Sequence, residues 1–314
     1  MLGIWITAAP AVILFYHTKK DEKSFEYRHK KISYVIISLL LFFTTVLLYG
    51  SFIEPHLIRI SHYDIELPKI VKPIRIAFVS DFQIGTYNHN DWVETVVKKI
   101  KEQQPDIVFL GGDNVDNILY NETEAQELKP LQKLAQEYPV YAINGNHEYG
   151  VGRDPKNSPD TYQGADMSIY AQHILENMGI HYLVNDLEKV TVNKQSFYLF
   201  GGGSYWAGKL DFSVLENRNE QIPTLALIHN PSFIFEQYPT DVNLYLSGHT
   251  HGGQIRLPFI GPIGRVDNIL PKDYYKGLHT LSSKTKLLVT VGIGESGTRA
   301  RLWNPPEISI ITLR

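Results

Sequence analysis

IRIAFVS (74–80), DWVETVVKKIKEQ (91–103) and DIVFLGG (106–112) follow one another in the chain and decide its fold class. The first and third are short runs rich in β-branched residues, whereas the second repeats apolar side chains at helical spacing. A strand, a helix and a strand in this order are typical of a parallel sheet. A further helical pattern over 122–138 leads into PVYAING (139–145), so we expect an α/β domain whose first strands are largely parallel.

The second half of the chain is richer in strand-like runs, which are SFYLFGG (196–202), TLALIHN (224–230), VNLYLSG (242–248), KLLVTVG (286–292) and EISIITL (307–313). Polar clusters stand at the ends of predicted strands, and these are SDFQ (80–83), GGDNVD (111–116), GNHE (145–148), IHN (228–230) and GHTHGGQ (248–254). Open α/β sheets place their ligand sites at the carboxyl ends of strands. We therefore expect the five clusters to meet in one site.

The clusters supply oxygen and imidazole donors, namely Asp81, Asp113, Asn146, His229, His249 and His251. This set suits Mn²⁺, Fe²⁺, Zn²⁺ or Ni²⁺ better than Ca²⁺. Each residue alone has a plainer role, because Asp and Asn often cap helices or turns and a single His is usually a core or surface residue. Their order after successive strands favours a metal site. Asp116 and Glu148 are expected either to orient a metal ligand or to lie on the surface.

These motifs resemble the calcineurin-like metallophosphoesterase superfamily, whose pattern is DxH, GDxxD, GNHD/E, a lone His and GHxH. The resemblance covers about residues 74–314. Within the superfamily, GHTHGGQIRLP (248–258) and the tail at 292–313 resemble membrane-associated bacterial phosphodiesterases and transmembrane proteins with a metallophosphoesterase domain. The resemblance implies a four-layer α/β/β/α sandwich with the site at one edge of its two sheets.

The resemblance also implies a role for each matching residue. Asp113 would bridge two divalent metal ions, Asp81 and His251 would complete the first site, and Asn146, His229 and His249 would complete the second. His147 would be the general acid. Gln83 stands where the DxH histidine is expected, so it either supplies an amide oxygen to the first metal or orients a water. Mn²⁺ is the first choice of metal, with Zn²⁺, Fe²⁺, Ni²⁺ and Mg²⁺ as alternatives.

Two metals that share a carboxylate can hold a phosphate ester and activate a water for hydrolysis. His147 could then protonate the leaving oxygen. Arg256 and Arg301 are candidate contacts for the phosphate, with a surface or ion-pair role as the alternative for each.

An apolar segment precedes the α/β part. Residues 32–49 carry no charge and the apolar run continues to 53, which is long enough to cross a hydrocarbon core of roughly 30 Å. Residues 2–18 predict a shorter or tilted first span. The loop 17–31 holds six Lys/Arg against three Asp/Glu, which predicts a cytoplasmic loop and an extracytoplasmic catalytic domain. The expected organisation is an integral membrane anchor (1–56), a connector that adds an edge strand (57–73) and the catalytic domain (74–314).

The amino-acid composition limits the classes of function that the chain can have. The chain has no cysteine, which excludes thiolate catalysis and Cys-type zinc sites. After residue 56 it carries 24 Lys/Arg and 29 Asp/Glu, so no nucleic-acid partner is expected. We expect a membrane-anchored phosphodiesterase or pyrophosphatase acting on a lipid-linked or cell-envelope phosphate. The alternatives are a UDP-2,3-diacylglucosamine-type hydrolase of lipid A synthesis, which the predicted topology disfavours, and a non-catalytic membrane binding module with a decayed first metal site at Gln83.

Overall fold

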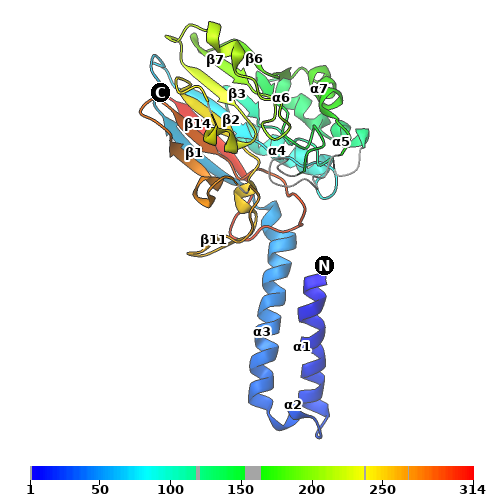
Figure 1. Cartoon of the computed structure of the whole chain (residues 1–314). Coiled ribbons are helices and arrows are strands. Elements are labelled where there is room, and N and C mark those ends of the chain that lie inside the picture. Colours follow the sequence, from blue (N-terminus) through cyan, green and yellow to red (C-terminus); the bar gives the residue numbers. More distant parts are fainter. Residues whose placement is uncertain (1, 118–120, 153–163, 237, 268) are drawn as a thin grey trace.

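The computed structural model describes residues 2–117, 121–152, 164–236, 238–267 and 269–314. Figure 1 shows a pair of long helices on one side and a layered α/β body on the other, with the two helices side by side. The carboxyl terminus lies in the body, away from the helices. The α/β class predicted from the sequence is confirmed.

The first sheet has the strand order β1-β14-β2-β3-β4-β5. The strands β2 to β5 run parallel, as predicted, and β14 runs antiparallel to β2 and parallel to β1. Its strands are β1 (Arg59–Ile65), β2 (Ile74–Val79), β3 (Ile107–Leu110), β4 (Val140–Ala142), β5 (His181–Tyr182) and β14 (Glu307–Leu313).

The second sheet has the order β12-β13-β9-β8-β7-β6, with β7, β8, β9 and β13 parallel. Its strands are β6 (Asp186–Val192), β7 (Gln195–Gly201), β8 (Thr224–Leu227), β9 (Leu244–Ser247), β12 (Gly277–Thr280) and β13 (Lys286–Val289). A separate two-stranded hairpin consists of β10 (Arg256–Leu257) and β11 (Gly261–Pro262).

The core lies in three layers of apolar side chains. One layer fills the space between the two sheets and includes Phe78, Phe109 and Leu227, all fully buried. A second packs the first sheet against helices α4 (Asn90–Glu102), α5 (Glu122–Glu127), α6 (Gln132–Ala135) and α7 (Ser168–Asn177). The third covers the second sheet, and in the described chain it is made of loops and the 3₁₀ helices η4 (Ser213–Asn217), η5 (Pro231–Phe235) and η7 (Lys272–Tyr275). The sandwich thus has four layers, with short turns as the fourth.

The helix expected over 122–138 is broken into α5, the 3₁₀ helix η3 (Lys129–Leu131) and α6. The break is at Pro130, which has no amide hydrogen and whose ring clashes with the preceding turn. The sequence pattern predicted one helix because the apolar spacing continues across the proline.

The two long helices are α1 (Leu2–Lys20) and α3 (Lys30–Leu48), joined through α2 (Phe25–Arg28). The Thr44 hydroxyl donates a hydrogen bond of 2.8 Å to the Thr7 hydroxyl and links the two helices. Among the described helices, only the stretch Lys30–His56 is long and apolar enough to cross a membrane. Most of its apolar side chains face outward, since only 17% of the most apolar 18-residue segment of this helix is buried.

The helix α3 continues through a π-helical turn, η1 (Tyr49–Ile53), and a 3₁₀ turn, η2 (Glu54–His56), into β1. The Gly50 carbonyl accepts a hydrogen bond from the Arg301 amide at 2.8 Å. A Cβ at Gly50 would lie 3.0 Å from the Arg301 carbonyl oxygen, so a larger residue would require this carbonyl to shift slightly.

Strand pairing fixes which edge of the sandwich faces the helices. Arg59, the first residue of β1, pairs with Glu307, the first residue of β14. Because β14 is antiparallel to β2, this end of β14 lies beside the carboxyl end of β2. The edge that carries the predicted metal ligands is therefore the edge from which α3 departs. Figure 1 shows α3 leaving the layered body.

The residues expected as a connector thus form part of the sandwich, and this leads to a stability prediction. A fragment that starts at residue 74 lacks β1 and the buried side chains of Ile65, Leu67 and Ile70. Each buried side chain contributes about 1.5–3 kcal/mol, which is large against a total of about 5–15 kcal/mol. Fragment 74–314 should therefore unfold at lower temperature than fragment 57–314 in a thermal melt. Equal melting temperatures would contradict this role for β1.

Candidate metal centre

The six donors predicted from the sequence lie at the carboxyl ends of β2, β3, β4, β8 and β9, at one edge of the sandwich. Each has at most 4% of its surface exposed. Asp113, His229 and His249 each offer one ligand atom, and these three atoms lie within 4.8 Å of one another. His251 Nε2 lies 3.4 Å from Asp81 Oδ1, and His229 Nε2 lies 3.8 Å from the same oxygen. The fold therefore brings two carboxylates and three imidazoles into one cluster.

Asp113 occupies the centre of this cluster. Its Oδ2 lies 3.0 Å from His229 Nε2 and 3.9 Å from His147 Nε2. Its Oδ1 accepts a hydrogen bond of 2.9 Å from the His147 amide. Although burial opposes the charged form, His229 and His147 lower the pKa of this carboxyl. Asp113 is thus an anion that contacts His229 of the second predicted metal site and Gln83 of the first.

Asp81 joins the two sheets at the site. Its carboxylate accepts hydrogen bonds from the His249 amide at 2.9 and 3.2 Å, although the two residues are far apart in the chain. A Cβ at Gly248 would come within 2.3 Å of Asp81 Oδ2. The glycine of GHTH is therefore required for the second sheet to approach Asp81 this closely.

Asn146 is held by a residue that the sequence analysis did not select. The Asn230 amide donates to Asn146 Oδ1 at 2.9 Å, and Asn146 Nδ2 donates to the Val151 carbonyl at 2.5 Å. Asn230 directly follows the predicted ligand His229, which is the signal that could have identified it. The Trp206 ring stands edge-on to the His249 ring, with the ring centroids 4.1 Å apart. No sequence signal marks Trp206 as it does Asn230, because Trp206 comes from a loop that is distant in the chain.

The backbone at the site is strained. Four of the six donors and Gln83 have φ between 46° and 68°, a region that side chains rarely adopt, and these residues are Asp81, Gln83, Asp113, His249 and His251. Such conformations persist only where the surrounding structure enforces them, and they concentrate at functional sites.

The imidazoles are oriented by backbone carbonyls. His229 Nδ1 donates to the Gly111 carbonyl at 2.7 Å, and His251 Nδ1 donates to the Gly294 carbonyl at 3.2 Å. In each ring Nε2 is left to face the cluster, which is the arrangement found in histidines that ligate metals. Within the described chain, His249 Nε2 and Gln83 Oε1 are buried without a hydrogen-bond partner. Buried polar atoms of this kind fit ligands that await a cation.

Protonation of the histidines differs across the cluster. Burial lowers the pKa of His251 to about 4, and burial together with His229 lowers the pKa of His249 well below its usual value. Both are therefore neutral near pH 7, as a metal ligand must be. Burial opposes protonation of His229 too, but the Asp113 carboxylate outweighs it and raises the pKa of His229 to about 9, so a cation bound at this imidazole would have to displace a proton.

Gln83 lies in the cluster, where the superfamily pattern has histidine. Its Nε2 donates to Asp113 Oδ2 at 3.1 Å, and its unpartnered Oε1 is the atom that could bind a metal or a water. The geometry is compatible with both roles that the sequence left open for this residue.

Glu148 is fully buried and connects the loops that carry Asp113 and Asn146. Its carboxylate accepts hydrogen bonds from the amides of Asp113 at 3.1 Å, Asn114 at 2.6 Å and Gly145 at 2.7 Å. Glu148 therefore does not lie on the surface, and its contacts favour the other expected role, in which it orients the loops of the candidate ligands. Asp116 is also buried, and its backbone carbonyl accepts a hydrogen bond of 2.6 Å from His147 Nδ1.

His147 has the placement that a general acid needs. Because Nδ1 is bound to the Asp116 carbonyl, Nε2 faces the cluster, and the side chain is 13% exposed. Burial disfavours its charged form, but Asp113 and the Asp116 hydrogen bond outweigh burial and raise its pKa. His147 can therefore carry a proton beside the anionic centre.

The two arginines have different places. Arg301 is fully buried, and its guanidinium donates to four backbone carbonyls, those of Val291, Gly292, Gly294 and Asn304. It therefore braces the loop that orients His251, a role that differs from both the phosphate contact and the surface or ion-pair role considered from the sequence. Arg256 is half-buried at the start of β10, where Nη1 donates to the Gly252 carbonyl at 2.7 Å.

A sandwich of two sheets with carboxylates, imidazoles and amides at one edge defines a metal-dependent phosphoesterase. The family model described as calcineurin-like phosphoesterase matches residues 74–253, more than half of the chain, and the protein belongs to this family. It is a metal-dependent hydrolase of phosphoric esters.

Relatives agree with this assignment. The chain is 28% identical to the metallophosphoesterase YkuE of Bacillus subtilis, over 85% of this chain and 89% of that protein. It is 30% identical to the phosphodiesterase YaeI of Escherichia coli, over 77% of this chain and 82% of that protein. A Helicobacter pylori metallophosphoesterase is 30% identical over 81% of this chain, which spans 64% of the longer relative.

The contacts of Glu148 lead to a prediction. Glu148→Ala removes the acceptor shared by two ligand loops, so metal affinity should fall by about 10- to 100-fold, the usual effect of losing a residue that orients ligands. The measurement is metal titration of the purified protein with bound-metal analysis. Glu66→Gln, on an exposed carboxylate outside the site, is the matched control. A folded Glu148→Ala protein with unchanged affinity would contradict the role.

Proposed function

We propose that the protein is a membrane-anchored, dinuclear-metal phosphodiesterase or pyrophosphatase that acts on a lipid-linked or cell-envelope substrate. The observation that carries this proposal is the position of the Asp113 cluster at the edge of the sandwich from which α3 departs. A phosphate that projects from the membrane surface would face this edge.

The membrane anchor is inferred from the exposed apolar surfaces of α1 and α3. In water such surfaces are unfavourable, whereas in a bilayer they contact acyl chains. The loop between the helices carries the excess of Lys/Arg, which favours its cytoplasmic location. The catalytic domain would then be extracytoplasmic.

Asp81, Gln83 and His251 would hold one metal ion, Asn146, His229 and His249 a second, and Asp113 would contact both. Such ions supply Lewis acidity and a water of lowered pKa. The mixture of carboxylate and amide oxygens with imidazoles suits Mn²⁺. An amide at Gln83 in place of imidazole adds a hard, neutral donor, which favours Mn²⁺ or Mg²⁺ over Zn²⁺ at the first position.

The chain's own residues position the substrate's leaving oxygen and supply its proton. Nε2 of His147 faces the cluster while Nδ1 stays bonded to the Asp116 carbonyl, so the ring keeps one orientation through the reaction. Protonation of the departing alkoxide by such a group contributes about 10²- to 10⁴-fold in rate. A diester needs this proton because an alkoxide is a poor leaving group.

The proposal is tested by varying the leaving group in the presence of Mn²⁺. His147→Ala should lower the hydrolysis of an alkyl phosphodiester by about 10²- to 10⁴-fold and that of bis-(4-nitrophenyl) phosphate far less, because nitrophenolate leaves without a proton. Asp113→Asn should abolish both activities and lower the metal content. His62→Ala and Asp64→Asn, at exposed positions of β1, are the matched controls.

Equal losses on both diesters would refute the acid role of His147. A folded, metal-loaded wild-type chain that hydrolyses neither diester nor a pyrophosphate would refute the proposed function.

The topology is tested with single cysteines, because the chain contains none. Lys194→Cys lies in the exposed β6–β7 turn of the domain, and Lys23→Cys lies in the exposed loop between the helices. An impermeant maleimide added to intact spheroplasts should label position 194 and should label position 23 only after permeabilisation. The reverse pattern would place the domain in the cytoplasm.

A further inference from the structure

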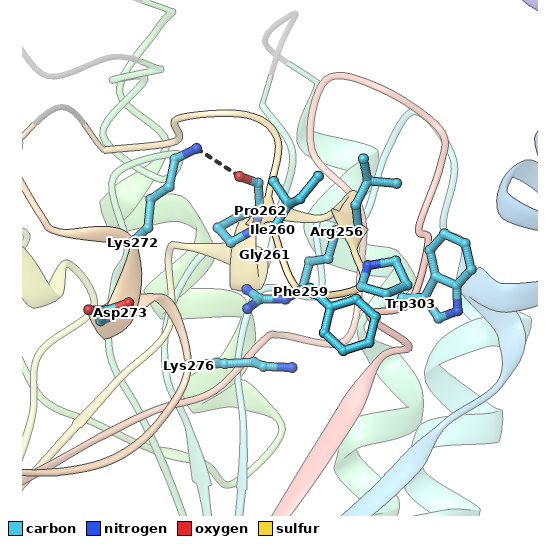
Figure 2. A pocket seen from close by; sticks show the side chains of 11 residues that line it. Arg256, Phe259, Ile260, Gly261, Pro262, Lys272, Asp273, Lys276 and Trp303 are labelled. Carbon is cyan, nitrogen blue, oxygen red and sulfur yellow. Dashed lines mark hydrogen bonds between the residues drawn. The ribbon is translucent and has the colours of Figure 1, made fainter.

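A pocket of about 680 Å³ lies beneath the β10–β11 hairpin, outside the metal cluster. Figure 2 shows the side chains that line it. Three are cationic, Arg256, Lys272 and Lys276, and one is acidic, Asp273. The rim carries apolar side chains that include Phe259, Ile260 and Trp303. The pocket thus combines positive charge with an apolar edge.

The apolar edge is unusually exposed. Phe259 is fully exposed, Ile260 is 72% exposed and Ile263 is 54% exposed, so the hairpin presents large apolar side chains to its surroundings. Trp303, beside them, is 54% exposed. Phe259 and Trp303 also have φ of 66° and 50°, a conformation that bulky side chains avoid. The fold therefore maintains left-handed backbone at two aromatic residues, of which Phe259 is not buried within this chain and Trp303 is buried only in part.

The hairpin lies where α3 meets the domain. Arg256 donates its amide to the Leu302 carbonyl at 2.9 Å, and the Asn304 amide bonds to the Glu54 carboxylate at the end of the helical stretch. A neighbouring cavity is lined by Ile255 together with Leu47 and Phe52 of the anchor. Figure 1 likewise shows β11 on the side of the body from which α3 leaves. The hairpin is therefore at the level of the membrane surface if α3 crosses the bilayer.

We infer that the β10–β11 hairpin enters the membrane interface and that the pocket beneath it binds the phosphate headgroup of an anionic phospholipid. The inference rests on the membrane anchoring proposed above. Exposed aromatic and aliphatic side chains suit the boundary between headgroups and acyl chains, where Trp is enriched. Cationic side chains at that depth attract anionic lipids.

The cations differ in how free they are to bind phosphate. Lys272 Nζ donates to the Pro262 carbonyl at 2.7 Å, as the dashed line in Figure 2 marks. Arg256 uses Nη1 for the Gly252 carbonyl, which leaves its other donors for a ligand. Burial and the neighbouring Arg256 lower the pKa of Lys276, and an anion beside it would favour the charged form further. Asp273 opposes the binding of an anion, and the three cations outnumber it.

The pocket is also connected to the metal cluster by neighbouring residues and a hydrogen bond. Gly252, whose carbonyl holds Arg256, directly follows the predicted ligand His251. The Asn304 side chain, next to Trp303, donates to the His251 carbonyl at 2.6 Å. A lipid held here would keep the catalytic edge close to the bilayer.

Insertion is tested with the full chain in lipid nanodiscs. Phe259→Cys is labelled with an environment-sensitive fluorophore, and Lys194→Cys is the matched control at the opposite edge, since it precedes the amino end of β7. The emission of the label at 259 should shift to shorter wavelength and be quenched by lipids with a nitroxide high on the acyl chain. The label at 194 should show neither effect.

If the chain has entered the nanodisc and the fluorophore at position 259 still emits as it does in water, the inference is overturned and the proposed anchoring stands. The inference is also overturned if the emission at position 259 shifts to shorter wavelength but lipid nitroxides do not quench it. A second copy or another protein would then cover the hairpin. Failure of the full chain to enter nanodiscs would overturn the anchoring and the inference together. Hydrolysis of soluble diesters is measured separately and does not depend on any of these outcomes.

Headgroup binding is tested by titrating the full chain in neutral detergent with phosphatidylglycerol and, separately, with phosphatidylcholine and inorganic phosphate. Lys272→Gln with Lys276→Gln should weaken phosphatidylglycerol binding by about fivefold for each charge removed. Arg at both positions should retain the affinity, and Lys133→Gln, on an exposed lysine of α6, should have no effect. Equal binding of the two phospholipids would refute the headgroup site, as would an unchanged double Gln variant. Binding of inorganic phosphate as tight as that of phosphatidylglycerol would refute a lipid as the occupant.

Discussion

The buried carboxylate of Glu148 is the contact on which the catalytic edge depends. It accepts hydrogen bonds from the amides of Asp113, Asn114 and Gly145, so one side chain satisfies the backbone of two neighbouring loops. Each of these amides would otherwise be buried without an acceptor, at a cost of about 1–3 kcal/mol. Because Asp113 and Asn146 are carried by these loops, their positions relative to each other follow from Glu148.

The approach of the two sheets imposes a second constraint. Asp81 belongs to the first sheet and His249 to the second, and the carboxylate of one accepts the amide of the other. This contact requires glycine at position 248 and left-handed backbone at several ligand residues. The strain is offset by the surrounding hydrogen bonds and by the apolar layer between the sheets. A rigid site results, with the imidazoles oriented before any ligand arrives.

The helices and the catalytic edge are connected by a short series of contacts. Gly50 accepts the amide of Arg301, the Arg301 guanidinium bonds to the Gly294 carbonyl, and that carbonyl orients the His251 ring. The position of the helical pair is thereby fixed relative to the site. This connection accounts for the burial of Arg301, for which the sequence left open a phosphate contact and a surface or ion-pair role.

The sequence by itself determined the α/β class, most strands of the two sheets and the donors of the cluster, because these depend on local features, whereas β5, β6 and β12 were not predicted. Alternating apolar runs define strands, and polar residues just after strands must share an edge in a parallel sheet. Asp81, Asp113, His229, His249 and His251 could be selected in this way. The stretch long and apolar enough to cross a membrane was equally local, since length and lack of charge define it.

Only the tertiary structure decided what each polar side chain contacts. Glu148 and Arg301 were both polar residues near a motif, yet one proved to support two ligand loops and the other to brace backbone carbonyls. Asn230 and Trp206 gained their roles from the meeting of segments that are distant in the chain. Burial and hydrogen-bond partners depend on the packing of both sheets, which no local pattern specifies. The same is true of the position of the β10–β11 hairpin beside the end of α3.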